Sequence, residues 1–199
     1  MRRSPKKDAL LQAAKELFGE YGFAETTFKK ISERAGVALG LLTHHYGSKE
    51  KLFFAAGMDV LQNFIETLRK TAEDSPDGRT GVLNFCGAYL DFTIDQRSNW
   101  LVLVRCSPYT DMKPSAEREV MLKEFEKVHH ILEAQLQRGQ NDGSIQPLSA
   151  ISTAQIIVGL LVGANRTRFL TPYTYGNSQT FYTETLAFVD RAISFKPER

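Results

Sequence analysis

The sequence predicts an all-α protein of about nine helices, and three observations support this fold class. Apolar residues recur at three- and four-residue steps along nearly all of the 199 residues, which places them on one face of a helix. The sequence shows no strand-like alternation of apolar and polar residues, and no internal repeat. Gly, Pro, Asn and Asp stand between the helical segments, where helices end.

The first part of the chain predicts four helical segments in close succession. The first has an apolar face and stops at Gly22. Thr27 is a suitable N-cap for a short second helix that ends at Gly36. A third short helix is expected at about 38–46, and Ser48 caps the fourth. Three short helices therefore come before one long helix.

The rest of the chain predicts five more helices. Loop-forming residues at 74–78, 108–114, 141–143 and 171–177 interrupt the apolar spacing. The expected helices lie at about 79–96, 99–106, 115–138, 149–169 and 178–195. We therefore expect an N-terminal three-helix domain at 1–52 and a larger helical domain at 53–199.

Charge is distributed unevenly between the two expected domains. Residues 1–52 hold 10 Lys and Arg against 6 Asp and Glu, whereas the remaining residues hold 15 against 17. A basic N-terminal domain followed by a slightly acidic one is expected of a protein whose N-terminal domain contacts phosphate. Four of the positive charges lie in the first seven residues, so a solvated tail is the alternative.

The composition also indicates a cellular compartment. The longest apolar run, 154–164, has 11 residues, whereas a membrane span needs about 20. The basic start leads into an amphipathic segment, so we expect no signal peptide and a cytoplasmic protein.

Cys86 and Cys106 have no metal or redox spacing. His129 and His130 lie near Glu126 and Glu133, but surface salt bridging explains them better than a metal. We expect no metal and no cofactor.

The second and third helices satisfy the requirements of a helix-turn-helix. Ser32 is small where the two helices cross, and Gly36 permits a left-handed turn. Ile31, Val37 and Leu42 form an apolar wedge that fixes the crossing. The third helix would then expose small or uncharged side chains that can approach base edges.

Residues 26–52 read TTFKKISERAGVALGLLTHHYGSKEKL, which resembles the DNA-binding signature of the TetR family of bacterial regulators. The resemblance covers about residues 8–55. It rests on the Thr-led helix, the Ala-Gly-Val turn, the Gly-containing recognition helix, the aromatic residue after His and the Ser-Lys-Glu-x-Leu start of helix four. The family usually has Ser or Thr at the position of Ala38, Tyr at that of Thr43, and often a polar or basic residue at that of Leu39. These departures predict an unusual operator sequence.

The resemblance and the helix geometry together imply a set of DNA contacts. Lys49, at the N-terminus of helix four, would meet a phosphate, and Thr27 and Lys29 would reach the same backbone. Each lysine has the alternative of a solvated surface charge, and His45 could instead pack on the first helix. The predicted DNA-binding residues are Thr27, Phe28, Lys29, Leu39, Gly40, Leu41, Thr43, His44, His45 and Lys49.

The expected helix at 149–169 is apolar almost all round, so it needs two partners. Gly159 and Gly163 would allow another helix to approach closely. Packing within one chain is the alternative, but the pairing with helix 178–195 resembles the family's four-helix dimer interface. The predicted dimer contacts are Ile156, Gly159, Leu160, Gly163, Phe181, Leu186, Val189 and Ile193.

A ligand pocket is expected among the helices of residues 80–170. Its candidates are mostly aromatic with a few polar anchors: Tyr89, Phe92, Trp100, Arg105, Cys106, Phe125 and Asn165. For each one, ordinary core packing is the alternative. These side chains favour an apolar or aromatic effector. Arg166 and Arg168 could neutralise an anionic ligand, but we expect them to face solvent.

The sequence therefore predicts a ligand-responsive transcriptional repressor that binds a pseudo-palindromic operator as a homodimer and is released by a small effector. Helix four connects both domains, so ligand binding would move this helix and with it the DNA-binding domain. An adaptor that has lost DNA binding and an activator of the same fold are the alternatives. An enzyme is not expected, because the sequence shows no phosphate loop, nucleophile elbow, metal-ligand cluster or carboxylate pair.

Overall fold

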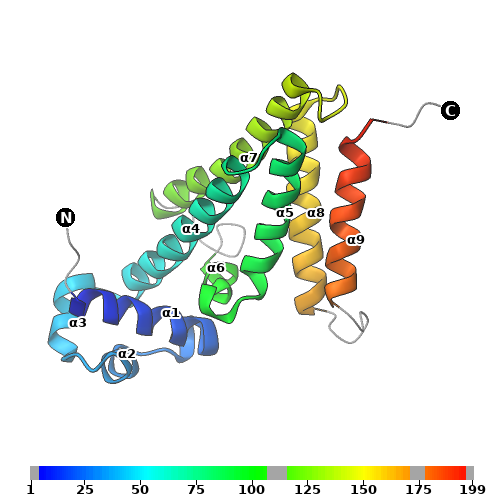
Figure 1. Ribbon diagram of the computed structural model, residues 1–199. Helices are drawn as coiled ribbons and strands as arrows, with labels where there is room; N and C mark the ends of the chain where they lie inside the picture. The colour runs from blue at the N-terminus through cyan, green and yellow to red at the C-terminus, as the bar shows by residue number, and fades with distance from the viewer. Residues whose placement is uncertain (1–4, 107–115, 171–177, 196–199) are drawn as a thin grey trace. The chain divides into compact units, whose positions relative to one another are not determined.

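The structure is a computed structural model that describes residues 5–106, 116–170 and 178–195, apart from the side chains of residues 106, 169, 170 and 178 (Figure 1). Within these ranges the chain forms nine α-helices, one short 3-10 helix and no strand, which confirms the predicted all-α class. The helices are α1 (Pro5–Glu25), α2 (Phe28–Ala35), α3 (Leu39–Tyr46), α4 (Lys49–Glu73), α5 (Gly78–Ile94), α6 (Trp100–Cys106), α7 (Ala116–Asp142), α8 (Ala150–Leu170) and α9 (Ser178–Ile193).

α1 and α7 continue beyond their predicted ends. Gly22 adopts the left-handed φ of +78° that its type permits, but it kinks α1, which continues to Glu25. α7 continues past the expected residue 138 to Asp142, and Gly143, with φ +78°, follows its end. The 3-10 helix at Gln96–Ser98 was not predicted.

The chain divides into two compact units. Residues 1–63 and 95–124 make up the first unit, and residues 64–94 and 125–199 make up the second. In the first unit α1 packs against α2, α3 and α6. Its core contains fully buried apolar side chains, each of which stabilises the fold by about 1.5–3 kcal/mol. They include Leu10, Phe18, Ile31, Leu42 and Leu52.

An ion pair and an aromatic cluster join α1 to the start of α4 inside the first unit. Lys15 Nζ lies 2.9 Å from Asp59 Oδ2, and both side chains are largely buried. The rings of Phe18, Phe23 and Phe53 contact one another, with centroid distances of 4.9–6.2 Å. These contacts fix the direction in which α4 leaves the three short helices.

In the second unit α5, α8 and α9 lie side by side (Figure 1). Arg79 on α5 and Asp190 on α9 form a bidentate ion pair, with both N–O distances at 2.7 Å. Cys86 is buried in this unit, and burial raises the pKa of its thiol to about 12. No helix among the described residues is long and apolar enough to cross a membrane.

Candidate nucleic-acid interface

The turn between α2 and α3 has the geometry that the sequence predicts. Thr27 Oγ1 accepts a hydrogen bond from the Lys30 amide at 3.2 Å, which caps α2. Gly36 is left-handed, with φ +62° and ψ +34°, and the Val37 amide donates to the Ser32 carbonyl at 3.0 Å. This pattern satisfies the last carbonyls of α2 and turns the chain sharply.

Buried contacts hold the turn in place. Ile31 and Leu42 are fully buried and Val37 is half-buried, as expected of the apolar wedge. Ser32 is also buried, and its Oγ donates to the Lys29 carbonyl at 2.9 Å. Since α1 packs on both α2 and α3, the two short helices rest on a common base and present their outer faces together.

The outer face of α3 is made of small, apolar and imidazole side chains. Leu39, Gly40, Thr43 and His44 are exposed, and Leu41 is half-buried. A Cβ built on Gly40 would meet no atom of the described part of the chain within 4 Å. Packing within the protein therefore does not require a glycine at position 40.

The start of α3 has no side-chain cap. Ala38 takes the N-cap position and makes no side-chain hydrogen bond, where a Ser or Thr would make one. Thr43 Oγ1 donates back to the Leu39 carbonyl at 3.3 Å. His45 is half-buried, and its ring lies 6.5 Å from the ring of Tyr46, whose hydroxyl donates to the Lys7 carbonyl at 3.5 Å.

Lys49 has a hydrogen-bond partner within the protein that was not predicted from the sequence. Its Nζ donates to the Phe23 carbonyl at 3.0 Å and lies 4.3 Å from the centroid of the Phe23 ring. An ammonium has three donors, so this bond ties the start of α4 to α1 and leaves further donors on the same group. Ser48 Oγ accepts from the Lys51 amide at 3.3 Å and caps α4, as predicted.

The remaining predicted contact residues surround the start of α2. Thr27 and Lys29 are exposed, and Phe28 is half-buried. The side chain of Lys29 is 80% exposed, and its Nζ stands 3.9 Å from Glu33 Oε1. An ion pair this exposed contributes little to stability, so the lysine can exchange its partner for another anion.

Residues 10–56 match the family model described as bacterial regulatory proteins, tetR family. This range contains the whole α2–α3 turn described above. The fold is also similar to that of SmeT from Stenotrophomonas maltophilia in complex with triclosan, with a TM-score of 0.78 at 18% identity, over 98% of this chain and 94% of SmeT. The match to this family model covers about a quarter of the chain.

Sequence similarity to curated relatives covers only part of this chain. The regulator RutR of Escherichia coli strain K12 is 37% identical over 71 residues, which are 36% of this chain and 34% of RutR. The repressor AcnR of Corynebacterium efficiens is 32% identical over 62 residues, which are 31% of this chain and 33% of AcnR. The chain thus spans about a third of the length of the curated relatives it matches. RutR is a transcriptional regulator and AcnR is a transcriptional repressor.

The predicted ligand-binding residues fall in both units. Tyr89 and Asn165 are buried in the second unit, where Phe92 and Phe125 are half-buried. Trp100 is buried in the first unit.

Two other predicted ligand-binding residues lie on α6, in the first unit. Arg105 is exposed there, and its Nη1 donates to the Phe18 carbonyl. Cys106 is the last residue of α6, and its side chain lies outside the described residues.

Two residues near these candidates were not predicted to belong to a site. Phe64 packs against both Tyr89 and Phe92, with centroid distances of 5.0 Å. Arg168 was expected to face solvent, but it is half-buried, and its Nη1 donates to the Tyr182 hydroxyl at 3.4 Å. The three-residue spacing of Asn165 and Arg168, which places them on one side of α8, was the available signal.

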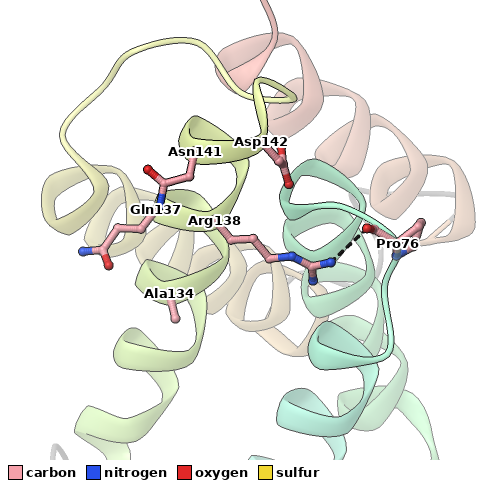
Figure 2. Close-up of a pocket in the computed structure, with 6 residues that line it drawn as sticks. All are labelled: Pro76, Ala134, Gln137, Arg138, Asn141 and Asp142. Carbon is pink, nitrogen blue, oxygen red and sulfur yellow. Dashed lines mark hydrogen bonds between the residues drawn. The ribbon is translucent and has the colours of Figure 1, made fainter.

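Figure 2 shows a different hollow of about 520 Å³ in the second unit, lined by Pro76, Ala134, Gln137, Arg138, Asn141 and Asp142. Arg138 Nη2 donates to the carbonyls of Ser75 and Pro76, each at 2.9 Å. The Asp142 carboxylate accepts from the Gly78 amide at 2.9 Å. These bonds connect the end of α7 to the start of α5, which gives the polar groups of this hollow a structural role. None of the predicted ligand-binding residues lines it.

The predicted dimer residues separate into exposed and buried groups. Ile156 is 69% exposed, and Gly159 and Gly163 are exposed beside it. Within the residues that the structure describes, a Cβ built on either glycine would meet no atom within 4 Å. Leu160, Phe181 and Leu186 are half-buried, whereas Val189 and Ile193 are buried in the core of their own chain.

Proposed function

We propose that this chain is a transcriptional repressor that binds a pseudo-palindromic operator as a homodimer and is released by a small effector. The observation that carries the proposal is the exposed outer face of α3, held by the Gly36 turn on a buried base. A short helix fixed in this way, with small side chains on its outer face, suits the width of the major groove.

Gly40 supports the proposal that α3 contacts another molecule. A glycine inside a helix destabilises it by about 0.5–1 kcal/mol relative to alanine. No atom of the described residues would meet a Cβ at this position, so packing among them does not account for this cost. Close approach of another surface, here the edges of base pairs, accounts for it. Leu39, Leu41, Thr43 and His44 would share this contact.

The phosphate contacts would come from residues that flank α3. Lys29 is almost fully exposed, and Thr27 lies beside it at the start of α2. Phe28 and His45 would border the same backbone. Lys49 would contact a phosphate with donors that its bond to Phe23 leaves available, and this bond would hold the ammonium in place.

The exposed apolar face of α8 and α9 supports dimerisation. Ile156 and Phe188 are 69% and 56% exposed, and Val162 is also exposed. Apolar surface of this kind is typical of a protein–protein contact. Gly159 and Gly163 would let a helix of a second copy approach closely. We leave Val189 and Ile193 out of the proposed interface because they are buried within the chain.

The effector would bind in the second unit, where aromatic side chains are clustered. SmeT, whose fold this chain shares, binds triclosan in its complex and represses an efflux pump in its own organism. For this chain, Phe64, Tyr89 and Phe92 support an apolar or aromatic effector. Binding would release DNA by a shift between two conformations.

Selection of genomic DNA fragments with the purified protein tests this function. The proposal expects enrichment of a two-fold-related sequence whose half-sites are centred about 34 Å apart along the duplex. An activator would enrich the same kind of sequence and is distinguished by transcription from the enriched promoter in vitro. An adaptor without DNA binding would enrich nothing, and that result would contradict the proposal.

Oligomeric state is tested separately by sedimentation. The wild-type protein is expected to be a dimer, and Ile156→Glu is expected to shift it toward the monomer because it places a charge in the apolar contact. Glu184→Gln is the control, since Glu184 is an exposed residue of α9 outside the predicted contact set. A wild-type monomer at micromolar concentration would contradict the dimer proposal.

A further inference from the structure

Asn165 has an unusual environment for a polar side chain. It is only 6% exposed, and its Oδ1 accepts no hydrogen bond from any residue that the structure describes. A buried acceptor without a donor costs free energy, and folded proteins rarely retain one without a reason. The Asn165 oxygen therefore stands out from the buried polar groups around it.

Other buried polar side chains of the second unit are satisfied. Thr93 Oγ1 donates to the Leu90 carbonyl at 2.7 Å, and Thr185 Oγ1 donates to the Phe181 carbonyl at 2.8 Å. Ser75 Oγ donates to the Thr71 carbonyl at 3.0 Å. The unit thus provides local partners for these buried hydroxyls, whereas no described residue donates to the Asn165 oxygen.

Aromatic residues lie on the helices that face Asn165. Asn165 shares the buried side of α8 with Val158 and Leu161, and α8 packs on both α5 and α9. These helices contribute the buried residues Tyr89 and Tyr182. Tyr182 lies close enough to Tyr89 for its hydroxyl to raise the pKa of Tyr89, after the larger effect of burial.

We infer that the Asn165 carboxamide is the polar anchor of the effector site, and that the effector is a neutral aromatic molecule with one N–H or O–H donor. This inference rests on the proposed function, because it assumes that the second unit binds a small effector. A donor on the ligand would complete the hydrogen bond that Asn165 Oδ1 lacks. An aromatic body would suit the rings of Tyr89 and Tyr182.

The surrounding charges favour a neutral ligand. Arg168 lies one turn from Asn165 on α8, and its guanidinium is 5.7 Å from the Tyr182 ring. A cationic ligand at Asn165 would be repelled by this positive charge. A carboxylate has no proton to donate to Asn165 Oδ1 at neutral pH. Phenols and indoles combine a neutral donor with an aromatic ring.

Two matched pairs of probes test the inference. 4-Phenylphenol and indole each have a donor, whereas 4-methoxybiphenyl and 1-methylindole have similar shapes without one. Isothermal titration should show that at least one donor probe binds the wild-type protein about tenfold more tightly than its partner, which is about 1.4 kcal/mol. Asn165→Leu should bind both members of that pair equally. Equal binding by the wild-type protein, or no binding of any probe, would overturn the inference.

A measurement without ligand tests the same inference through stability. Replacing Asn165 with leucine removes an unsatisfied buried acceptor, so the Tm of the free protein should rise by about 2–4 °C. Thr185→Val is the control, because it removes a satisfied hydroxyl; it should lower the Tm and keep the donor preference. A lower Tm for Asn165→Leu would mean that the carboxamide has a structural partner, and the inference would fail.

A DNA-binding measurement distinguishes failure of the effector inference from failure of the proposed function. If the wild-type protein selects an operator but Asn165→Leu retains the donor preference, only the effector inference is wrong. If the wild-type protein selects no operator, the proposed function fails whatever the probes show. Asn165→Leu should itself bind the operator like the wild-type protein in the absence of probe.

Discussion

Arg105 on α6 donates a hydrogen bond from Nη1 to the main-chain carbonyl of Phe18 on α1, at 3.1 Å. The two helices are also in close contact here, since a Cβ on Gly19 would lie 3.5 Å from Val102 Cγ2. Both helices belong to the first compact unit. α6 is therefore attached to α1, the helix on which α2 and α3 also pack.

Replacing Arg105 with methionine should weaken this attachment. The Phe18 carbonyl would lose a charge-assisted hydrogen bond, so the free energy of unfolding should fall by about 1 kcal/mol. Denaturation in urea measures this loss. Arg97→Met is the matched control, because Arg97 is 91% exposed and pairs only with the neighbouring Asp95 within the described residues. Equal effects of the two substitutions would contradict a specific role for Arg105.

Gly40→Ala should separate stability from DNA binding. The substitution should stabilise α3 by about 0.5–1 kcal/mol, because alanine favours a helix and the added Cβ meets nothing in the chain. It should weaken binding to the selected operator by about tenfold, because the methyl group would lie between α3 and the bases. Thermal unfolding and fluorescence anisotropy measure the two effects.

Gly87→Ala in α5 is the control for this pair of measurements. A Cβ on Gly87 also meets no atom within 4 Å, and Gly87 lies in the second unit. It should give a similar gain in stability with unchanged operator affinity. If Gly40→Ala left operator affinity unchanged as well, the outer face of α3 would not be the surface that contacts DNA.

Lys29→Ala should reduce the salt dependence of DNA binding. Loss of one phosphate contact lowers the slope of log affinity against log salt by about 1 and weakens binding to all sequences alike. Lys70→Ala removes the same charge from an exposed position near the end of α4, in the second unit, and should leave the slope unchanged. Identical slopes for the two variants would show that Lys29 makes no phosphate contact.

Asp190→Asn should have an effect on stability that depends on pH. The Arg79 guanidinium lowers the pKa of Asp190 in the folded protein, so the ion pair stabilises the fold above the unfolded pKa of about 3.9. This stabilisation is lost as pH falls through the lower, folded pKa. Asp190→Asn should therefore be less stable by about 0.5–1 kcal/mol at pH 7, allowing for the partial exposure of the pair.

Urea denaturation at pH 7 and at pH 3 or below checks this sign. The difference in unfolding free energy between wild type and Asp190→Asn should shrink at the lower pH, where Asp190 becomes protonated in the wild-type protein. A difference that stays constant over this range would mean that the carboxylate charge contributes nothing.

The α2–α3 turn could be predicted from sequence because its determinants are local. Thr27 caps the helix that it precedes, and Gly36 supplies the left-handed residue where the chain reverses. The apolar spacing of Ile31 and Leu42 identifies the buried side of each helix. These features depend on neighbours a few residues away, so the sequence contains nearly all of the information.

Contacts between distant segments could not be predicted in the same way. The bond from Lys49 to the Phe23 carbonyl depends on how α1 and α4 cross, which spacing along one helix does not specify. Apolar periodicity also did not separate Ile156, which is exposed, from Val189, which is buried within the chain. A hydrophobic side chain looks the same in sequence whether it packs against its own chain or another one.

The central claim is that α3 recognises a specific DNA sequence, and a comparison of two duplexes tests it most directly. Fluorescence anisotropy at physiological salt would compare the operator enriched from genomic DNA with a duplex of the same composition in scrambled order. The account predicts at least a thousandfold tighter binding to the operator, with most of this preference lost in His44→Ala. Equal affinity for both duplexes would contradict it.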